Sequence, residues 1–195
     1  MMDKSQLVDV IKHIMKKEKK VVAMYAPSIV TQFKADCNQF EEALRQCGFD
    51  KIMEVATGAD VCATNEAKEF TERMARGDKL MTTSCCSAYV RAVRKHVPDL
   101  SPCIADTRSP MHYIAEIAKK KYPDSVTVFI GPCLAKRREG FSDEFVDYVI
   151  SVEELNAFFI AKEIVPESLQ AEPKTKKASP YGRNFAKSGG VAEAV

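Results

Sequence analysis

The chain has 195 residues, of which 46% are hydrophobic and 29% charged, as is ordinary for a globular protein and unlike a disordered one. Its 29 basic and 27 acidic residues nearly balance, which argues against a nucleic-acid partner. Residues 1–20 predict a short amphipathic helix rather than a signal peptide, and no apolar run approaches the length of a membrane span. We therefore expect a cytoplasmic protein without a membrane partner.

From residue 21 onward, short apolar runs alternate with amphipathic helical patterns. The predicted strands are residues 21–26, 52–56, 79–83, 126–130 and 148–152. Apolar strands that alternate with helices are typical of parallel sheets covered on both faces. The predicted fold class is α/β, with two lobes of parallel sheet flanked by helices.

This order predicts three segments. They are an N-terminal helix at 1–20, a first α/β lobe at 21–105, and a linking helix with part of a second α/β lobe at 106–195. A polar, lysine-rich stretch at 166–183 predicts a loop within the last segment. Because the chain stops in what reads as the first turns of a helix, we expect an incomplete second lobe whose bare surface allows self-association.

Several helices can be placed from their patterns. One apolar stripe runs from Phe33 to Cys47, and another includes Phe70. Ser109 and Pro110 predict a helix start. His13, His96 and His112 show no metal-type spacing, and we expect all three to be surface or capping residues.

Chemically unusual residues follow three of the predicted strands. They are Ala26, Pro27 and Ser28 after the first strand, Cys85 and Cys86 after the third, and Cys133 and Lys136 after the fourth. Ligands collect at the carboxyl ends of parallel strands. A thiol at a helix N-terminus has a lowered pKa, and the thiolate is the form that binds iron.

Two other interpretations of these cysteines stay open. The three thiols can be partly buried loop residues without a chemical role. Cys85 and Cys86 can also serve a thiol-redox or zinc protein, although adjacent cysteines lack the spacing of common zinc sites. The convergence of three strand ends favours a shared metal site over either alternative.

The combination of TSCC at 83–86 with PCxxKxxE at 132–139 resembles the first two of the three cysteine motifs of FeFe-hydrogenases. The APS at 26–28, the GAD at 58–60 and the GGVAEA at 189–194 are also similar to segments of that family. The resemblance extends from about residue 21 to the end of the chain. It implies a catalytic α/β domain that binds the hydrogen cluster, a 4Fe–4S cubane joined to a diiron subsite.

The resemblance also implies roles for individual residues. Cys86 and Cys133 would ligate the cubane, and Cys85 would pass protons to the diiron subsite. The cofactor-binding residues around that subsite would be Ala26, Pro27, Ser28, Lys136 and Glu139.

A proton relay to Cys85 would come from one helix. Glu66, Glu69 and Arg73 stand at i, i+3 and i+7, which places them on one helical face. Without the resemblance, these residues are better interpreted as a solvated face with a Glu69–Arg73 ion pair.

The sequence departs from the family pattern at several points. The third motif, which would supply two more thiolates, is absent, so we expect no cofactor and no activity in this chain alone. Gly131 stands where a methionine is usual, and Ala105 where a relay serine is common. No ferredoxin-type cysteine run is present, so we expect an electron-carrier or iron–sulfur domain as partner.

Two functions remain. The chain is the cluster-binding part of a hydrogenase that interconverts protons, electrons and dihydrogen, or it belongs to a slow, hydrogen-sensing or regulatory iron–sulfur protein.

Overall fold

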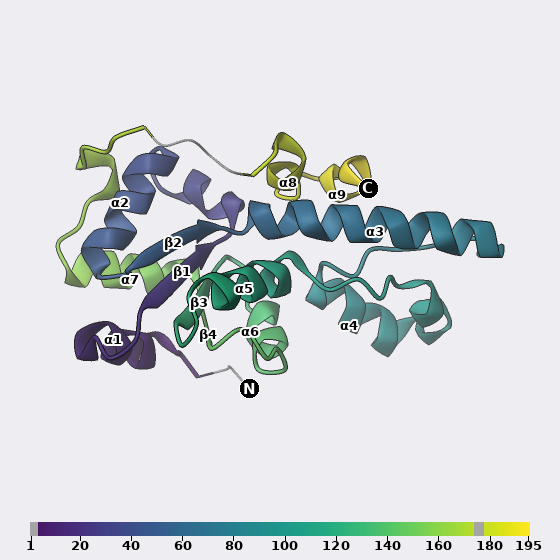
Figure 1. Cartoon of the computed structure of the whole chain (residues 1–195), viewed down its shortest axis with the longest axis horizontal. Coiled ribbons are helices and arrows are strands. Elements are labelled where there is room, and N and C mark those ends of the chain that lie inside the picture. Colours follow the sequence, from purple (N-terminus) through teal and green to yellow (C-terminus); the bar gives the residue numbers. More distant parts are fainter. Residues whose placement is uncertain (1–3, 174–177) are drawn as a thin grey trace.

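The core of the molecule is a four-stranded, all-parallel sheet with strand order β2-β1-β3-β4 (Figure 1). The structure, a computed structural model, describes residues 4–173 and 178–195. The strands are β1 (Val21–Tyr25), β2 (Lys51–Glu54), β3 (Val126–Ile130) and β4 (Tyr148–Ile150). The predicted α/β class is confirmed.

The two central strands are buried on both faces, as their unbroken apolar sequences require. In β1, Val21, Ala23 and Tyr25 face one hydrophobic cluster, whereas Val22 and Met24 face another. The first cluster contains residues of α1 (Leu7–Lys16), α2 (Cys37–Cys47) and α7 (Val152–Ala161). The second contains residues of α5 (Pro110–Lys121). Helices therefore cover both faces of the sheet.

The remaining helices extend the molecule beyond the sheet. The long helix α3 (Ala56–Arg76) runs away from the sheet in Figure 1, with α4 (Ser87–His96) below it and α8 (Pro180–Asn184) and α9 (Gly190–Ala194) above it. Helix α6 (Ala135–Gly140) follows β3. Short 3-10 helices span Pro27–Gln32, Pro98–Cys103 and Pro166–Ser168.

Side-chain caps explain where several helices begin. Asp36 and Gln39 form a capping box at the start of α2, and Ser151 and Glu154 form another at α7. Pro110 is the first residue of α5, as predicted. Because Asp36 caps α2, this helix begins at Cys37, and Phe33 of the predicted stripe lies outside it.

The segment at 79–83 was predicted as a strand but is not part of the sheet. It makes only an isolated bridge between Thr82 and Ile104. Thr82 accepts from the Ala105 N–H at 2.7 Å and donates its own N–H to the Cys103 carbonyl at 2.7 Å. The backbone N–H and carbonyl of Thr82 thus form their hydrogen bonds with the segment after α4 and not with a strand of the sheet.

The sheet joins strands from both predicted lobes. β1 and β2 come from residues 21–105, and β3 and β4 come from residues 106–195. The structure therefore has one sheet where two were expected, because β3 pairs with β1 along its whole length. The domain boundaries themselves stay a prediction.

Three local predictions were wrong. Phe70 is 43% exposed, because α3 buries Glu66 and Arg73 instead. His112 is buried, and its Nδ1 lies 2.8 Å from Oδ2 of Asp143. The predicted loop at 166–183 includes the start of helix α8; its residues 174–177 lie outside the described residues. Within the described part of the chain, no helix is long and apolar enough to cross a membrane.

Candidate functional site

A cavity of about 260 Å³ opens at the carboxyl edge of the sheet. Seven of the predicted site residues line it: Ala26, Pro27, Ser28, Cys85, Cys86, Cys133 and Lys136. Parallel strands place their carboxyl ends at one edge, so loops far apart in the sequence meet there. The cavity is therefore built from the segments after β1 and β3 together with the TSCC segment.

Backbone hydrogen bonds hold the two strand ends side by side. The Ala26 N–H donates to the Ile130 carbonyl at 2.9 Å, and the Gly131 N–H donates to the Ile150 carbonyl at 3.2 Å. The loops after β1 and β3 therefore begin next to one another at the carboxyl edge of the sheet.

The TSCC segment reaches this edge without a strand of its own. The Ser84 hydroxyl donates to the Thr107 carbonyl, and Cys86 is the N-cap of α4. The Cys86 thiol sulfur accepts from the Tyr89 N–H at 3.4 Å.

Lys136 connects the two cysteine-bearing loops. Its ammonium donates to the Cys85 carbonyl at 3.0 Å and to Glu139 Oε2 at 2.7 Å. The Ser109 hydroxyl donates to the other carboxylate oxygen of Glu139. Glu139 does not line the cavity, but its carboxylate holds the ammonium group of Lys136, which does. An ammonium group has three donors, and these two acceptors use two of them.

Gly182 of helix α8 and two residues that follow the helix, Phe185 and Ala186, line one side of the cavity. The Ser179 N–H donates to Asp60 of α3 at 2.9 Å, and its hydroxyl donates to the same carboxylate.

An ion pair links α8 to the sheet. The Arg183 guanidinium binds both carboxylate oxygens of Glu54 at 2.9 and 3.0 Å.

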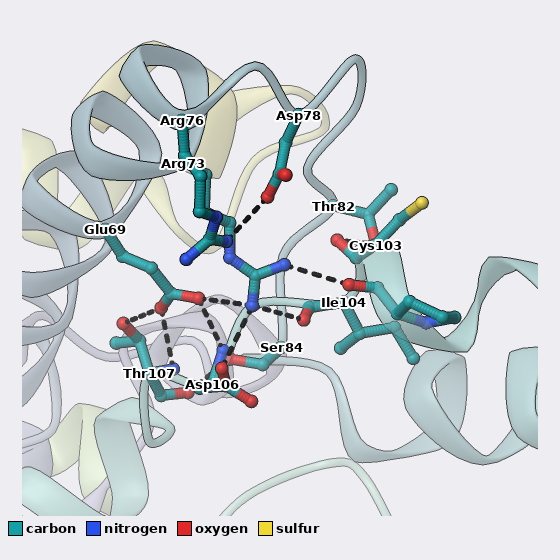
Figure 2. Close-up of polar contacts among 11 residues, drawn as sticks. Glu69, Arg73, Arg76, Asp78, Thr82, Ser84, Cys103, Ile104, Asp106 and Thr107 are labelled. Carbon is teal, nitrogen blue, oxygen red and sulfur yellow. Dashed lines mark hydrogen bonds and ion pairs between the residues drawn. The ribbon is translucent and has the colours of Figure 1, made fainter.

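The predicted relay residues Glu69 and Arg73 lie away from the cavity, in a tight polar network (Figure 2). The Glu69 carboxylate accepts from the Asp106 N–H at 2.8 Å, from the Thr107 N–H at 2.9 Å and from the Thr107 hydroxyl at 2.6 Å. Arg73 lies 2.7 Å from Glu69 and donates to the Pro102 and Ile104 carbonyls at 3.0 Å each.

The alternative interpretation of this face of α3 was a solvated surface with a Glu69–Arg73 ion pair. The Glu69–Arg73 ion pair is present, but Arg73 is only 7% exposed, so the face is buried rather than solvated. Burial opposes ionisation of Glu69, but the hydrogen bonds from Thr107 and Asp106 outweigh it and lower the pKa of that carboxyl.

Glu66, the third predicted relay residue, is 2% exposed and faces a different set of partners. Burial raises the pKa of its carboxyl, although hydrogen bonds from the Thr83 hydroxyl and the Ser84 backbone oppose the shift. The buried Cys62 thiol lies 3.9 Å from Glu66 and donates to the Arg108 carbonyl at 3.3 Å. The α3 face thus carries two carboxyls whose pKa values are shifted in opposite directions.

The expected lowering of the cysteine pKa values does not hold at Cys85. Burial raises the pKa of its thiol, and the hydrogen bond from Thr83 only partly compensates. Cys85 precedes the N-cap of α4 and stays protonated more readily than an exposed thiol.

Sequence reasoning missed two residues of the site. The hydroxyl of Thr83, in the TSCC motif, donates to the Cys85 sulfur at 3.3 Å. Phe129 lines the cavity from β3, and a Cβ atom on Gly131 would lie 2.7 Å from its ring. The phenyl ring of Phe129 therefore occupies the space that a side chain at position 131 would need. This contact is visible only in the packing of the folded chain.

The cavity offers thiols, the type of ligand that an iron–sulfur cluster requires. Two thiols, Cys86 and Cys133, line one cavity with Lys136 between their loops. Among the described residues, no three His, Cys, Asp or Glu side chains gather as a metal-binding group. A cubane takes four thiolates, so two would have to come from outside the residues described.

Comparison with known proteins finds matches over most of the chain. The family model described as "Iron only hydrogenase large subunit, C-terminal domain" matches residues 19–195. Iron hydrogenase 1 of Clostridium pasteurianum is 31% identical over 209 residues, covering 91% of this chain and 36% of that protein. The NADP-reducing hydrogenase subunit HndD of Solidesulfovibrio fructosivorans is 29% identical over 178 residues, covering 75% of this chain and 30% of that subunit.

Solved structures show the same fold. A variant of the FeFe-hydrogenase HydA1 from Chlamydomonas reinhardtii aligns with a TM-score of 0.78 and 27% identity. The alignment covers 89% of this chain and 51% of that one. The chain spans about half of the solved protein and about a third of the curated relatives.

Proposed function

Since the chain belongs to the family of the C-terminal domain of iron-only hydrogenase large subunits, we propose that its cavity holds the cubane part of a hydrogen cluster. Cys86 and Cys133 would be two of its four thiolate ligands. The observation that carries the proposal is the gathering of Cys85, Cys86, Cys133 and Lys136 around one cavity at the carboxyl edge of the sheet.

The chain's own residues would position and protect the group. Lys136, fixed by Glu139 and the Cys85 carbonyl, would direct its remaining donor toward an anionic ligand. Pro27, Pro132 and Phe129 would keep water from the thiols. Ser109 would hold Glu139, and so Lys136, in place.

The activity that we propose for the whole protein is the interconversion of protons, electrons and dihydrogen. The bound cluster would supply the redox chemistry, and the Cys85 thiol would hold the proton to be transferred. An electron-carrier protein or iron–sulfur domain would be the partner, consistent with a relative described as a subunit of an NADP-reducing hydrogenase. We also propose a cytoplasmic location.

Cluster reconstitution tests the ligand assignment. The purified chain should be colourless, because it supplies two of four thiolates. With iron, sulfide and an excess of a small thiol to complete the ligand set, it should gain the visible absorption of an iron–sulfur cluster.

The variants Cys86→Ala and Cys133→Ala should abolish this absorption. Cys103→Ala, a half-buried cysteine outside the cavity, should keep it. Equal iron and sulfide loading by all three variants would reject the assignment.

A slow, hydrogen-sensing protein is the second candidate. The ring of Phe129 fills the space beside Gly131, and Ala105 offers no hydroxyl to a proton relay. Both features alter the surroundings of the cavity without removing its thiols. Hydrogen uptake and evolution by the cluster-loaded protein separate the two candidates, because rapid turnover excludes the sensing role.

A further inference from the structure

Lysine side chains gather at the amino end of the sheet, away from the long helix α3 (Figure 1). They come from three segments: the end of α1 with the residues that lead to β1, the first residue of β2, and the last turn of α5. Because the strands are parallel, their amino ends lie together and bring these segments to one edge. The whole chain is nearly balanced in charge, so the excess of lysine is local.

Three of these lysines surround one aromatic ring. The Nζ atoms of Lys20, Lys51 and Lys121 lie 6.0, 5.8 and 5.3 Å from the centroid of the Tyr122 ring. The negative face of such a ring attracts ammonium groups. The ring therefore holds near one another three exposed cations from different segments, which we call the lysine triad.

Most carboxylates at this end of the sheet are engaged by other groups. Asp50 accepts from a backbone N–H of β1 at 2.8 Å. Glu116 pairs with Lys120 at 2.7 Å, and Asp147 pairs with Lys119 at 2.6 Å. Within the described part of the chain, no carboxylate forms an ion pair with a member of the lysine triad.

The surroundings of the lysine triad add positive charge. The remaining carboxylates here, Glu18 and Asp124, are exposed. Beside them stand three more exposed lysines, Lys16, Lys17 and Lys19. Ammonium groups gathered around one ring repel one another, and an anionic partner would relieve this repulsion while a cationic one would add to it.

Independently of the proposed function, we propose that the lysine triad is a docking site for an acidic segment of a partner protein. Carboxylates of that segment would pair with ammonium groups that the Tyr122 ring already holds in place. Because the ring restricts the lysine side chains before binding, less conformational entropy is lost when the partner docks. Strands of five residues span roughly 16 Å, so the partner would sit away from the cavity at the carboxyl edge.

A protein partner fits this surface better than a nucleic acid. Nucleic-acid sites combine many phosphate contacts with aromatic rings that are free to stack on bases. Ammonium groups surround the Tyr122 ring, and the near balance of charge in the whole chain leaves no extended basic face.

Binding of a fluorescent octaglutamate peptide tests the docking site. Fluorescence anisotropy should show binding to the purified chain at low ionic strength, weakened by added salt. The triple variant Lys20→Gln/Lys51→Gln/Lys121→Gln should bind on the order of tenfold more weakly, because exposed ion pairs are individually weak but add up. An absence of binding to the wild type would overturn the proposal.

A matched variant separates the lysine triad from net charge. It makes the same change of charge at exposed lysines elsewhere: Lys34→Gln/Lys162→Gln/Lys187→Gln. This variant should bind octaglutamate like the wild type. An equal loss of affinity in both triple variants would attribute the binding to net charge and reject a defined site.

The role of the ring is tested at Tyr122. Tyr122→Leu removes the negative face that holds the ammonium groups and should weaken octaglutamate binding several-fold. Tyr122→Phe keeps that face and should bind like the wild type. Thermal unfolding followed by circular dichroism shows whether each variant is folded. Equal affinity in the wild type and a folded Tyr122→Leu variant would contradict the role of the ring.

Acetylation of the wild-type chain tests the site without any substitution. Octaglutamate should slow the reaction of acetic anhydride with the lysine triad and leave Lys34 and Lys187 unaffected, as measured by peptide mass spectrometry. Uniform protection, or none, would contradict a defined site. Tighter binding of an oligonucleotide of equal charge would overturn the choice of an acidic protein. These measurements use the chain without a cluster, so a failure here leaves the proposed function untouched.

Discussion

Two carboxyls one turn apart on α3 behave differently because their surroundings differ. Glu66 is almost fully buried, and burial raises the pKa of its carboxyl more than the hydrogen bonds from Thr83 and Ser84 lower it. Glu69 is surrounded by N–H and hydroxyl donors and by Arg73, so its pKa is lowered despite burial. A carboxyl whose folded-state pKa is lowered stabilises the fold above its unfolded pKa.

This difference predicts an acid-sensitive fold. The stabilisation from Glu69 should be complete above pH 4.5, the ordinary value for its carboxyl, and should be lost as the pH falls through its lower folded-state pKa. Glu69→Gln should lower the free energy of unfolding by roughly 1–3 kcal/mol at neutral pH. The free energy of unfolding of the Glu69→Gln variant should depend less on pH below 4.5 than that of the wild type.

Urea denaturation between pH 3 and pH 7 measures both effects; this pH range brackets the ordinary carboxyl value of about 4.5. Glu72→Gln, at an exposed position on the same helix, is the control and should leave the pH dependence unchanged. An identical pH dependence in Glu69→Gln and wild type would show that Glu69 contributes nothing to acid stability.

Helix α8 shows how one short element shapes the cavity. Its contact with α3 is close: a Cβ atom on Gly182 would lie 2.4 Å from the Ala56 carbonyl oxygen and 2.5 Å from Asp60 Oδ1. The glycine is required by this approach, because a backbone oxygen of α3 cannot move aside. Phe185 and Ala186 are thereby held against the cavity.

Gly182→Ala should displace α8 and uncover the cavity that Cys85 lines. We expect a loss of about 1–3 kcal/mol in the free energy of unfolding, as for other overpacked contacts. Alkylation of Cys85 should become faster, as measured by peptide mass spectrometry. Tyr181→Ala, at a position that is 58% exposed, should affect neither quantity. An unchanged alkylation rate in Gly182→Ala would mean that α8 does not cover the cavity.

At the scale of the whole molecule, one sheet connects the two halves of the chain. β1 and β3 pair along five residues, and the clusters on both faces of the sheet draw residues from both halves. Phe40 is fully buried and packs edge-on against Tyr25 and Phe159. This arrangement favours a single cooperative unit over two independent lobes.

Phe40→Ala should therefore destabilise both halves equally. The substitution should cost about 3–5 kcal/mol. Native-state hydrogen exchange should show the same loss of protection for β1 and β3 amides. Protection that is lost in β1 but retained in β3 would instead support two lobes that unfold separately.

The α/β class could be predicted from the order of residues alone, because apolar strands followed by helices leave few other arrangements. This order also determined which loops meet, since the residues after β1 and β3 must share the carboxyl edge of a parallel sheet. The Ser109–Pro110 helix start followed from local chemistry in the same way.

The placement of the other parts depends on contacts between segments that are far apart in the chain. Extended residues at 79–83 form no strand because their partner is the loop at 103–105, a long-range choice that periodicity does not encode. The opposite pKa shifts of Glu66 and Glu69 depend on which groups surround α3. Contacts between distant segments set these features, so they emerge only when the chain is folded.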